Sequence, residues 1–152
     1  MSTGAASVVI GRDPATVFAV VTDVTRMGEW SPECTAGRWV DGANGPTVGA
    51  KFEGDNALVI GGITLKRWTT TSEVTECDPG RVFAFVAEGY TTWRYEMEPV
   101  DGGTRLTESF AFETASAVQR FLYETVARRP SSMVKGMQQT LDAIKASLES
   151  ES

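Results

Sequence analysis

The sequence predicts an α+β fold in which a strongly curved antiparallel sheet encloses a long C-terminal helix. Three observations support this prediction. Residues 35–113 alternate short β-rich runs with turns that contain Gly or Pro, residues 12–14 read Arg-Asp-Pro as at a helix start, and residues 133–148 carry apolar residues at helical spacing. With 152 residues, 41% of them hydrophobic, the chain can bury a core, and we expect one domain over residues 1–152.

The N-terminal segment predicts one strand followed by two short helices. Residues 5–11 form a short apolar run, which favours a strand. Asp13 can cap a helix and Pro14 suits its first turn, so a helix is expected from Ala15 to about Asp23. A second helical turn is expected over residues 24–28, which places Trp30 in the following loop, within the stretch GEWSPEC.

Residues 35–113 predict about six antiparallel strands in a meander. Four segments in this region contain Gly, which readily adopts a positive φ angle, often beside Asp, Asn or Pro. They separate β-rich runs such as WRYEMEPV and TRLTESFAF, as expected for hairpins. The four predicted turns are Asn44-Gly45-Pro46, Gly61-Gly62, Asp78-Pro79-Gly80 and Asp101-Gly102-Gly103.

The C-terminal region predicts helix. Ser116 and Gln119 have the spacing of a capping box, and Pro130 is expected to kink or break the helix that begins there. Beyond Pro130, apolar residues recur at intervals of three and four and form one stripe, which should lie against the sheet. The stripe consists of Met133, Met137, Leu141, Ile144 and Leu148.

Alternation along the last two strands predicts their inner face. Trp93, Tyr95 and Met97 share one face of residues 92–99, and we expect it to be the inner one. In residues 104–112 the same rule places Glu108 beside Phe110 on the face that should be apolar. Glu108 is therefore either a ligand-facing carboxylate, a group compensated by an ion pair or hydrogen bond, or a residue that a bulge turns outward.

The same alternation applies to the two preceding strands. If Phe52 faces inward, Asn56 does so too. In the longest strand, the inner set is predicted to be Trp68, Thr70, Ser72 and Val74, with Lys66 and Glu76 outside.

An inner surface of many aromatics and few polar groups suits a ligand pocket, and equally an ordinary core. Met133 and Met137 allow both interpretations as well, because methionine fills cores and lines adaptable binding surfaces.

Composition narrows the classes of function. A net charge of −6 and a pI near 4.7 oppose binding to nucleic acid or an anionic membrane surface. The sequence has neither a leader pattern nor an apolar run long enough for a membrane span, so we expect a cytoplasmic protein. The absence of histidine removes His-dependent nucleophiles and His-ligated metals, and the spacing of Cys34 and Cys77 indicates neither a disulfide framework nor a metal site.

Several segments, taken in order, resemble the START-like SRPBCC superfamily, in particular its polyketide cyclase/dehydrase-like branch. They include DPATVFAVVTDVTRMGEWSP, VGAKFEGDN, RWTTTSEVTECDPGRVFAF, GGTRLTESF and MVKGMQQTLDAIKASLE. The resemblance implies a helix-grip fold, in which a seven-stranded antiparallel sheet wraps around the C-terminal helix and leaves a deep hydrophobic cavity. It also implies that Trp30 borders the cavity entrance, whereas packing alone would let Trp30 seal the lower core beside Phe18 and Val21.

Two functions follow as hypotheses. The first is binding of a small hydrophobic molecule, such as a polyketide, lipid or isoprenoid-like compound, by a monomer or homodimer that needs no cofactor or metal. The alternative is a polyketide cyclase or dehydratase, in which Glu108 acts as acid/base and Tyr95 helps to orient a carbonyl. Whether the chain is an enzyme is left open. The candidate ligand-binding residues are Trp30, Phe52, Asn56, Trp68, Trp93, Tyr95, Glu108, Phe110, Met133 and Met137.

Overall fold

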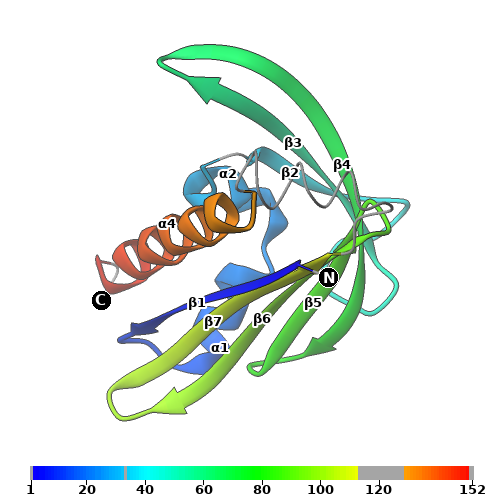
Figure 1. Ribbon diagram of the computed structural model, residues 1–152. Coiled ribbons are helices and arrows are strands. Elements are labelled where there is room, and N and C mark those ends of the chain that lie inside the picture. The colour runs from blue at the N-terminus through cyan, green and yellow to red at the C-terminus, as the bar shows by residue number, and fades with distance from the viewer. Residues whose placement is uncertain (1, 33, 113–128, 151–152) are drawn as a thin grey trace.

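The computed structural model describes residues 2–32, 34–112 and 129–150 (Figure 1). In these ranges, seven strands form one antiparallel sheet in the order β1-β7-β6-β5-β4-β3-β2. This confirms the predicted helix-grip fold, with its long C-terminal helix and two short helices after the first strand. The elements are β1 (Ser2–Ile10), α1 (Pro14–Val21), the 3-10 turn η1 (Val24–Arg26), α2 (Met27–Trp30), β2 (Cys34–Val40), β3 (Lys51–Ile60), β4 (Ile63–Asp78), β5 (Val82–Ala87), β6 (Thr91–Val100), β7 (Gly103–Phe112) and α4 (Arg129–Ser150).

The sheet curves around α4, which lies on its concave side (Figure 1). The apolar stripe of α4 faces the sheet as predicted, since Met133, Met137, Leu141, Ile144 and Leu148 are all buried. Burial of this stripe, rather than helix propensity, supplies most of the stability of such a helix. The capping box predicted at Ser116 and Gln119 and the chain immediately before α4 lie outside the described residues, so the expected break at Pro130 stays a prediction.

The N-terminal helices begin as the sequence predicts, but the second ends later. The Asp13 side chain accepts a hydrogen bond from the Thr16 backbone N–H, and Pro14 is the first residue of α1. After η1 the chain continues in α2, whose last residue is Trp30. The prediction that Trp30 lies in the loop after the second helical turn is therefore wrong, because a further turn is formed.

Two glycines allow η1 and α2 to lie directly against β2. A Cβ atom on Gly28 would overlap the carbonyl oxygen of Thr35, and one on Gly37 would overlap the carbonyl oxygen of Val24. The helical segment and the strand can therefore approach to this distance only where both positions lack a side chain. This close approach sets where α2 presents Trp30.

The β3–β4 hairpin projects beyond the rest of the sheet. β2 pairs with β3 only as far as Asn56, and β5 pairs with β4 only from Ser72 onward. The outer part of the hairpin is thus a two-stranded ribbon, which arches away from the sheet (Figure 1). It turns at Gly61 and Gly62, both of which have positive φ, as predicted.

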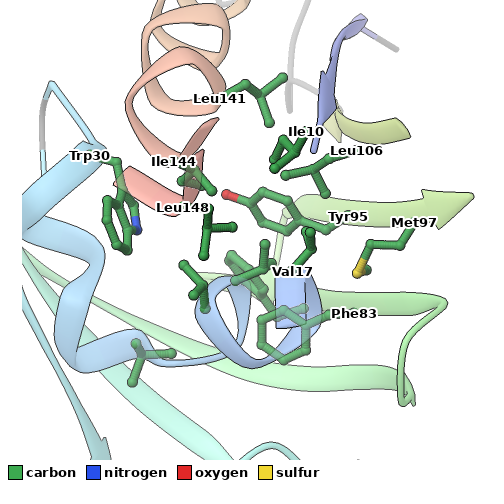
Figure 2. Close-up of a cluster of buried hydrophobic side chains, with 14 of the residues drawn as sticks. Ile10, Val17, Trp30, Phe83, Tyr95, Met97, Leu106, Leu141, Ile144 and Leu148 are labelled. Atoms are coloured by element: carbon green, nitrogen blue, oxygen red, sulfur yellow. The ribbon is translucent and has the colours of Figure 1, made fainter. Parts of the chain in front are cut away.

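The described core joins elements from both ends of the chain. Ile10, Val17, Phe83 and Leu106 belong to one core cluster with Leu141, Ile144 and Leu148 of α4, so β1, α1, β5 and β7 all contribute (Figure 2). Within the described residues, no helix is both long enough and apolar enough to cross a membrane. Cys34 is buried, and Cys77 is a free, half-buried cysteine.

Candidate functional site

A cavity of about 1200 Å³ lies between the concave face of the sheet and α4. Its walls come from α2, from strands β2 to β7 and from α4, with α1 and η1 contributing at one end. The volume lies somewhat above the usual range of about 300–1,000 Å³ for small-molecule sites. Nine of the ten candidate ligand-binding residues line it: Trp30, Phe52, Asn56, Trp68, Trp93, Tyr95, Glu108, Met133 and Met137.

Phe110 is the candidate that is not among the described lining residues. It is 2% exposed and packs with Phe112, Met133 and Met137 in a small cluster at one end of the core. Its ring lies 5.7 Å from that of Trp93 and 5.8 Å from that of Phe112. Phe112, two residues along the same strand, does line the cavity. Strand alternation places both rings on the inner face but does not say which of them reaches the cavity.

Trp30 lines the cavity and also belongs to the core. Its side chain is 8% exposed, and it shares a core cluster with Val21 and with Ile144 of α4, against which Phe18 packs. The Arg26 guanidinium lies 4.6 Å from the centre of the indole ring, within reach of a cation–π interaction. Trp30 thus contacts both the cavity and the core, and its place at the cavity entrance stays a prediction.

Tyr95 and Glu108 form a buried hydrogen-bonded pair in the cavity wall. They lie directly opposite each other in the β6–β7 ladder, so both point to the concave face. The Tyr95 hydroxyl donates a 2.9 Å hydrogen bond to Glu108 Oε2. Glu108 is 5% exposed, so no bulge turns it outward, as one sequence-based alternative would require.

The second carboxyl oxygen of Glu108, Oε1, is buried and has no hydrogen-bond partner in the described part of the chain. Burial raises the pKa of Glu108 to about 8, although the hydrogen bond from Tyr95 opposes this rise. Burial, with the charge of the neighbouring Glu108 as a second cause, also raises the pKa of Tyr95 well above its ordinary value. Both groups are therefore mainly uncharged at neutral pH.

Asn56 is held by its own hairpin. Its side-chain amide donates to the Gly54 carbonyl oxygen at 3.1 Å and lies 3.3 Å from Thr70 Oγ1. The contact with Thr70 ties β3 to β4, next to the place where Asn56 is paired with Trp68. The Asn56 amide nitrogen thus has a structural role within the wall, in addition to its place along the cavity.

A family model described as "Polyketide cyclase / dehydrase and lipid transport" matches residues 1–149. The chain belongs to this family. The match agrees with the branch of the SRPBCC superfamily that the sequence resembles. No curated protein matches the sequence.

Solved structures similar to this chain include another polyketide cyclase-like protein. The polyketide cyclase-like protein of Corynebacterium glutamicum is 39% identical, covers 98% of this chain and 92% of its own, and has a TM-score of 0.65. An AHSA1-like protein of Aeromonas hydrophila is 21% identical, with coverages of 98% and 93% and a TM-score of 0.67. A Mycobacterium smegmatis protein is 19% identical, with coverages of 99% and 92% and a TM-score of 0.69. The last two similarities show the fold alone.

This member of the polyketide cyclase / dehydrase and lipid transport family has two lysines at its cavity that sequence reasoning missed. Lys66 of β4 and Lys135 of α4 are both exposed and both contribute to the lining. Lys66 was expected outside, and its side chain is indeed in solvent, but its ammonium lies 5.6 Å from the centre of the Trp68 ring. Lys66 and Trp68 are two residues apart on the same strand, and this spacing was the sequence signal that their side chains share one face of the sheet.

The Glu76 side chain is exposed and lies off the inner face of the sheet, as predicted. The register of β4 and β5 shifts between Val74 and Glu76, and this shift turns Glu76 away from the inner face. There Glu76 forms an ion pair with Arg94. Within the described ranges of this family member, no three His, Cys, Asp or Glu side chains come close enough to hold a metal ion.

Proposed function

We propose that this protein binds a small, mainly apolar molecule in the cavity between the sheet and α4. The observation that carries the proposal is the cavity of about 1200 Å³, whose lining combines nine aromatic side chains with aliphatic, methionine and polar side chains. That combination is characteristic of small-molecule sites, because apolar walls supply affinity and a few polar groups supply orientation. The candidate ligands are polyketide, lipid or isoprenoid-like compounds, as the sequence already suggests.

Native mass spectrometry of freshly purified protein, followed by denaturing extraction, tests for a co-purifying ligand. Titration with the neutral apolar dye N-phenyl-1-naphthylamine then tests the cavity directly, because its fluorescence rises in an apolar site. We expect saturable binding. If no compound co-purifies and the dye does not bind, the proposal is contradicted.

Gly136 offers a matched pair of variants for this test. Gly136 lies on α4 and lines the cavity, and a Cβ atom added to it would meet only Pro32 at an ordinary distance of 3.6 Å. We expect Gly136→Phe to place a ring in the cavity and to abolish dye binding. Gly136→Ala adds a single methyl group and also improves helix propensity, so it should bind as the unmodified protein does. Equal binding by both variants would place the dye elsewhere.

A second candidate function is acid/base catalysis, and the Tyr95–Glu108 pair favours it specifically. A carboxyl group with a pKa near 8 can hold and transfer a proton at neutral pH. Cyclisation or dehydration of a β-keto compound needs such a group and a positioned substrate. Turnover of a 3-ketoacyl thioester by the unmodified protein, lost in Glu108→Gln with binding retained, would support this function. Equal turnover in that variant would exclude Glu108 from it.

A further inference from the structure

Within the described part of the chain, Glu108 has one carboxyl oxygen with a hydrogen-bond partner and one without. Tyr95 is the donor to Oε2, so Oε2 acts as an acceptor. When the carboxyl group is neutral, its proton therefore sits on Oε1. Oε1 is buried, has no partner among the described residues, and belongs to a residue that lines the cavity. The result is an O–H donor at the cavity wall with no acceptor from the described part of the protein.

No cation compensates Glu108 among the described residues. Its pKa of about 8 arises from burial, and the only opposing contribution is the hydrogen bond from Tyr95. Lys66 and Lys135 line the same cavity, but both are exposed. Among the described lining residues, the cavity wall at Glu108 thus presents an uncharged donor, and the two lysines are exposed to solvent.

A buried donor that lacks an acceptor loses its hydration without compensation, and such a loss typically costs about 1–3 kcal/mol. A ligand oxygen with a free lone pair would recover that loss on binding. A carboxylate would meet the same donor, but its charge would be buried with no cation beside it, which is far more costly. The wall therefore favours an acceptor without charge over an acceptor with charge.

We propose that the cavity selects ligands that present an uncharged oxygen acceptor, such as a ketone carbonyl, to Glu108 Oε1, and disfavours ligands that enter carboxylate first. This inference rests on the proposed binding function and deepens it. The proposed selection separates the three ligand classes. Keto-bearing polyketides and oxygenated isoprenoids can offer an uncharged acceptor to Glu108, whereas free fatty acids bound by their carboxylate cannot.

Three compounds of equal chain length test this selection: decan-2-one, decane and decanoate. Each is titrated against the bound N-phenyl-1-naphthylamine, and displacement gives its affinity. At about pH 6.5, where Glu108 is neutral, we expect decan-2-one to bind about tenfold more tightly than decane, the equivalent of one good hydrogen bond. We expect decanoate to bind no more tightly than decane. At about pH 9, where Glu108 is ionised and can only accept, the advantage of the ketone should disappear.

Two variants identify the donor. Glu108→Gln replaces the hydroxyl donor with an amide donor, so the ketone preference should persist and should no longer depend on pH. Glu108→Met keeps the length but removes both polar atoms, so ketone and alkane should bind equally. Because the comparison of compounds in the unmodified protein needs no variant, a variant that fails to fold does not remove the test.

The outcomes separate this inference from the proposed function. If none of the three compounds displaces the dye, the binding function itself is contradicted. If decane displaces it as well as decan-2-one does, binding stands and the inference falls, as it would if a bound water satisfied Oε1. If decanoate binds most tightly at about pH 6.5, the selection against charge is wrong.

Discussion

Tyr95 on β6 stands directly opposite Glu108 on β7, and its hydroxyl donates a 2.9 Å hydrogen bond to Oε2. The ladder register alone brings the two side chains together, because paired residues of an antiparallel sheet point to the same face. The curvature of the sheet then turns that face toward α4 (Figure 1), and both side chains line the cavity there. One local pairing thus determines both the burial of the carboxyl group and its only described partner.

The stability of the protein should fall as pH rises from about 4.5 to about 8. Below the ordinary Glu pKa of 4.5, Glu108 is protonated in both the folded and the unfolded chain. Between that value and the folded pKa of about 8, only the unfolded chain releases the proton, so the free energy of unfolding declines. The slope from this group is at most about 1.4 kcal/mol per pH unit, and it vanishes above the folded pKa.

Urea denaturation of the unmodified protein and of Glu108→Gln at a series of pH values isolates this effect. Other carboxylates titrate in both proteins, so their contributions cancel in the difference. We expect the variant to gain stability relative to the unmodified protein steadily across this range and to hold a constant difference above it. A difference that does not change with pH would show that Glu108 ionises normally in the folded state.

Tyr95→Phe should destabilise the fold through Glu108. The substitution keeps the ring but leaves Oε2 without its described donor, and an unsatisfied buried polar atom costs about 1–3 kcal/mol. Tyr90→Phe is the matched control, because Tyr90 is 63% exposed and its hydroxyl should contribute little. Chemical denaturation at neutral pH measures both. Similar small losses in the two variants would mean that the hydrogen bond contributes nothing net.

Much of the fold could be predicted because each signal was local. Asp13 and Pro14 define the start of α1, and paired glycines define the turn between β3 and β4. The β5–β6 turn was missed, since Glu88 adopts a positive φ angle that few non-glycine residues take, and Gly89 alone was a weak signal. Alternation in β7 correctly placed Glu108 on the inner face, because that strand pairs without a register shift on either side.

The details of the site depended on contacts between distant segments. Whether Phe110 or Phe112 reaches the cavity depends on where α4 lies, and strand periodicity has no information about that. The position of Trp30 depends on the approach of α2 to β2, which Gly28 and Gly37 permit. That Glu108 Oε1 has no partner among the described residues likewise depends on every described segment around it, and so only the folded structure reveals it.

Truncation on α4 should distinguish packed core from cavity wall. Leu141 is fully buried and is not among the described lining residues, so Leu141→Ala should cost about 2–5 kcal/mol. Met133 lines the cavity, so part of its surface faces that space rather than packed atoms, and Met133→Ala should cost at least about 1 kcal/mol less than Leu141→Ala. Helix propensity changes little between the two, because Leu and Met are similar. Urea denaturation provides both values, and equal costs would indicate that the cavity is filled around Met133.

Gly28→Ala should displace α2 from β2 and disturb the cavity wall at Trp30. The added Cβ would overlap the Thr35 carbonyl oxygen, a backbone atom that cannot move aside without shifting the strand. We expect a loss of stability of about 1–3 kcal/mol, as for other overpacked sites, together with a change in tryptophan fluorescence. Gly45→Ala is the control, since nothing lies within 4 Å of its added Cβ, and it should leave both properties unchanged. If Gly28→Ala is as stable as Gly45→Ala and has the same emission, α2 does not depend on this close approach.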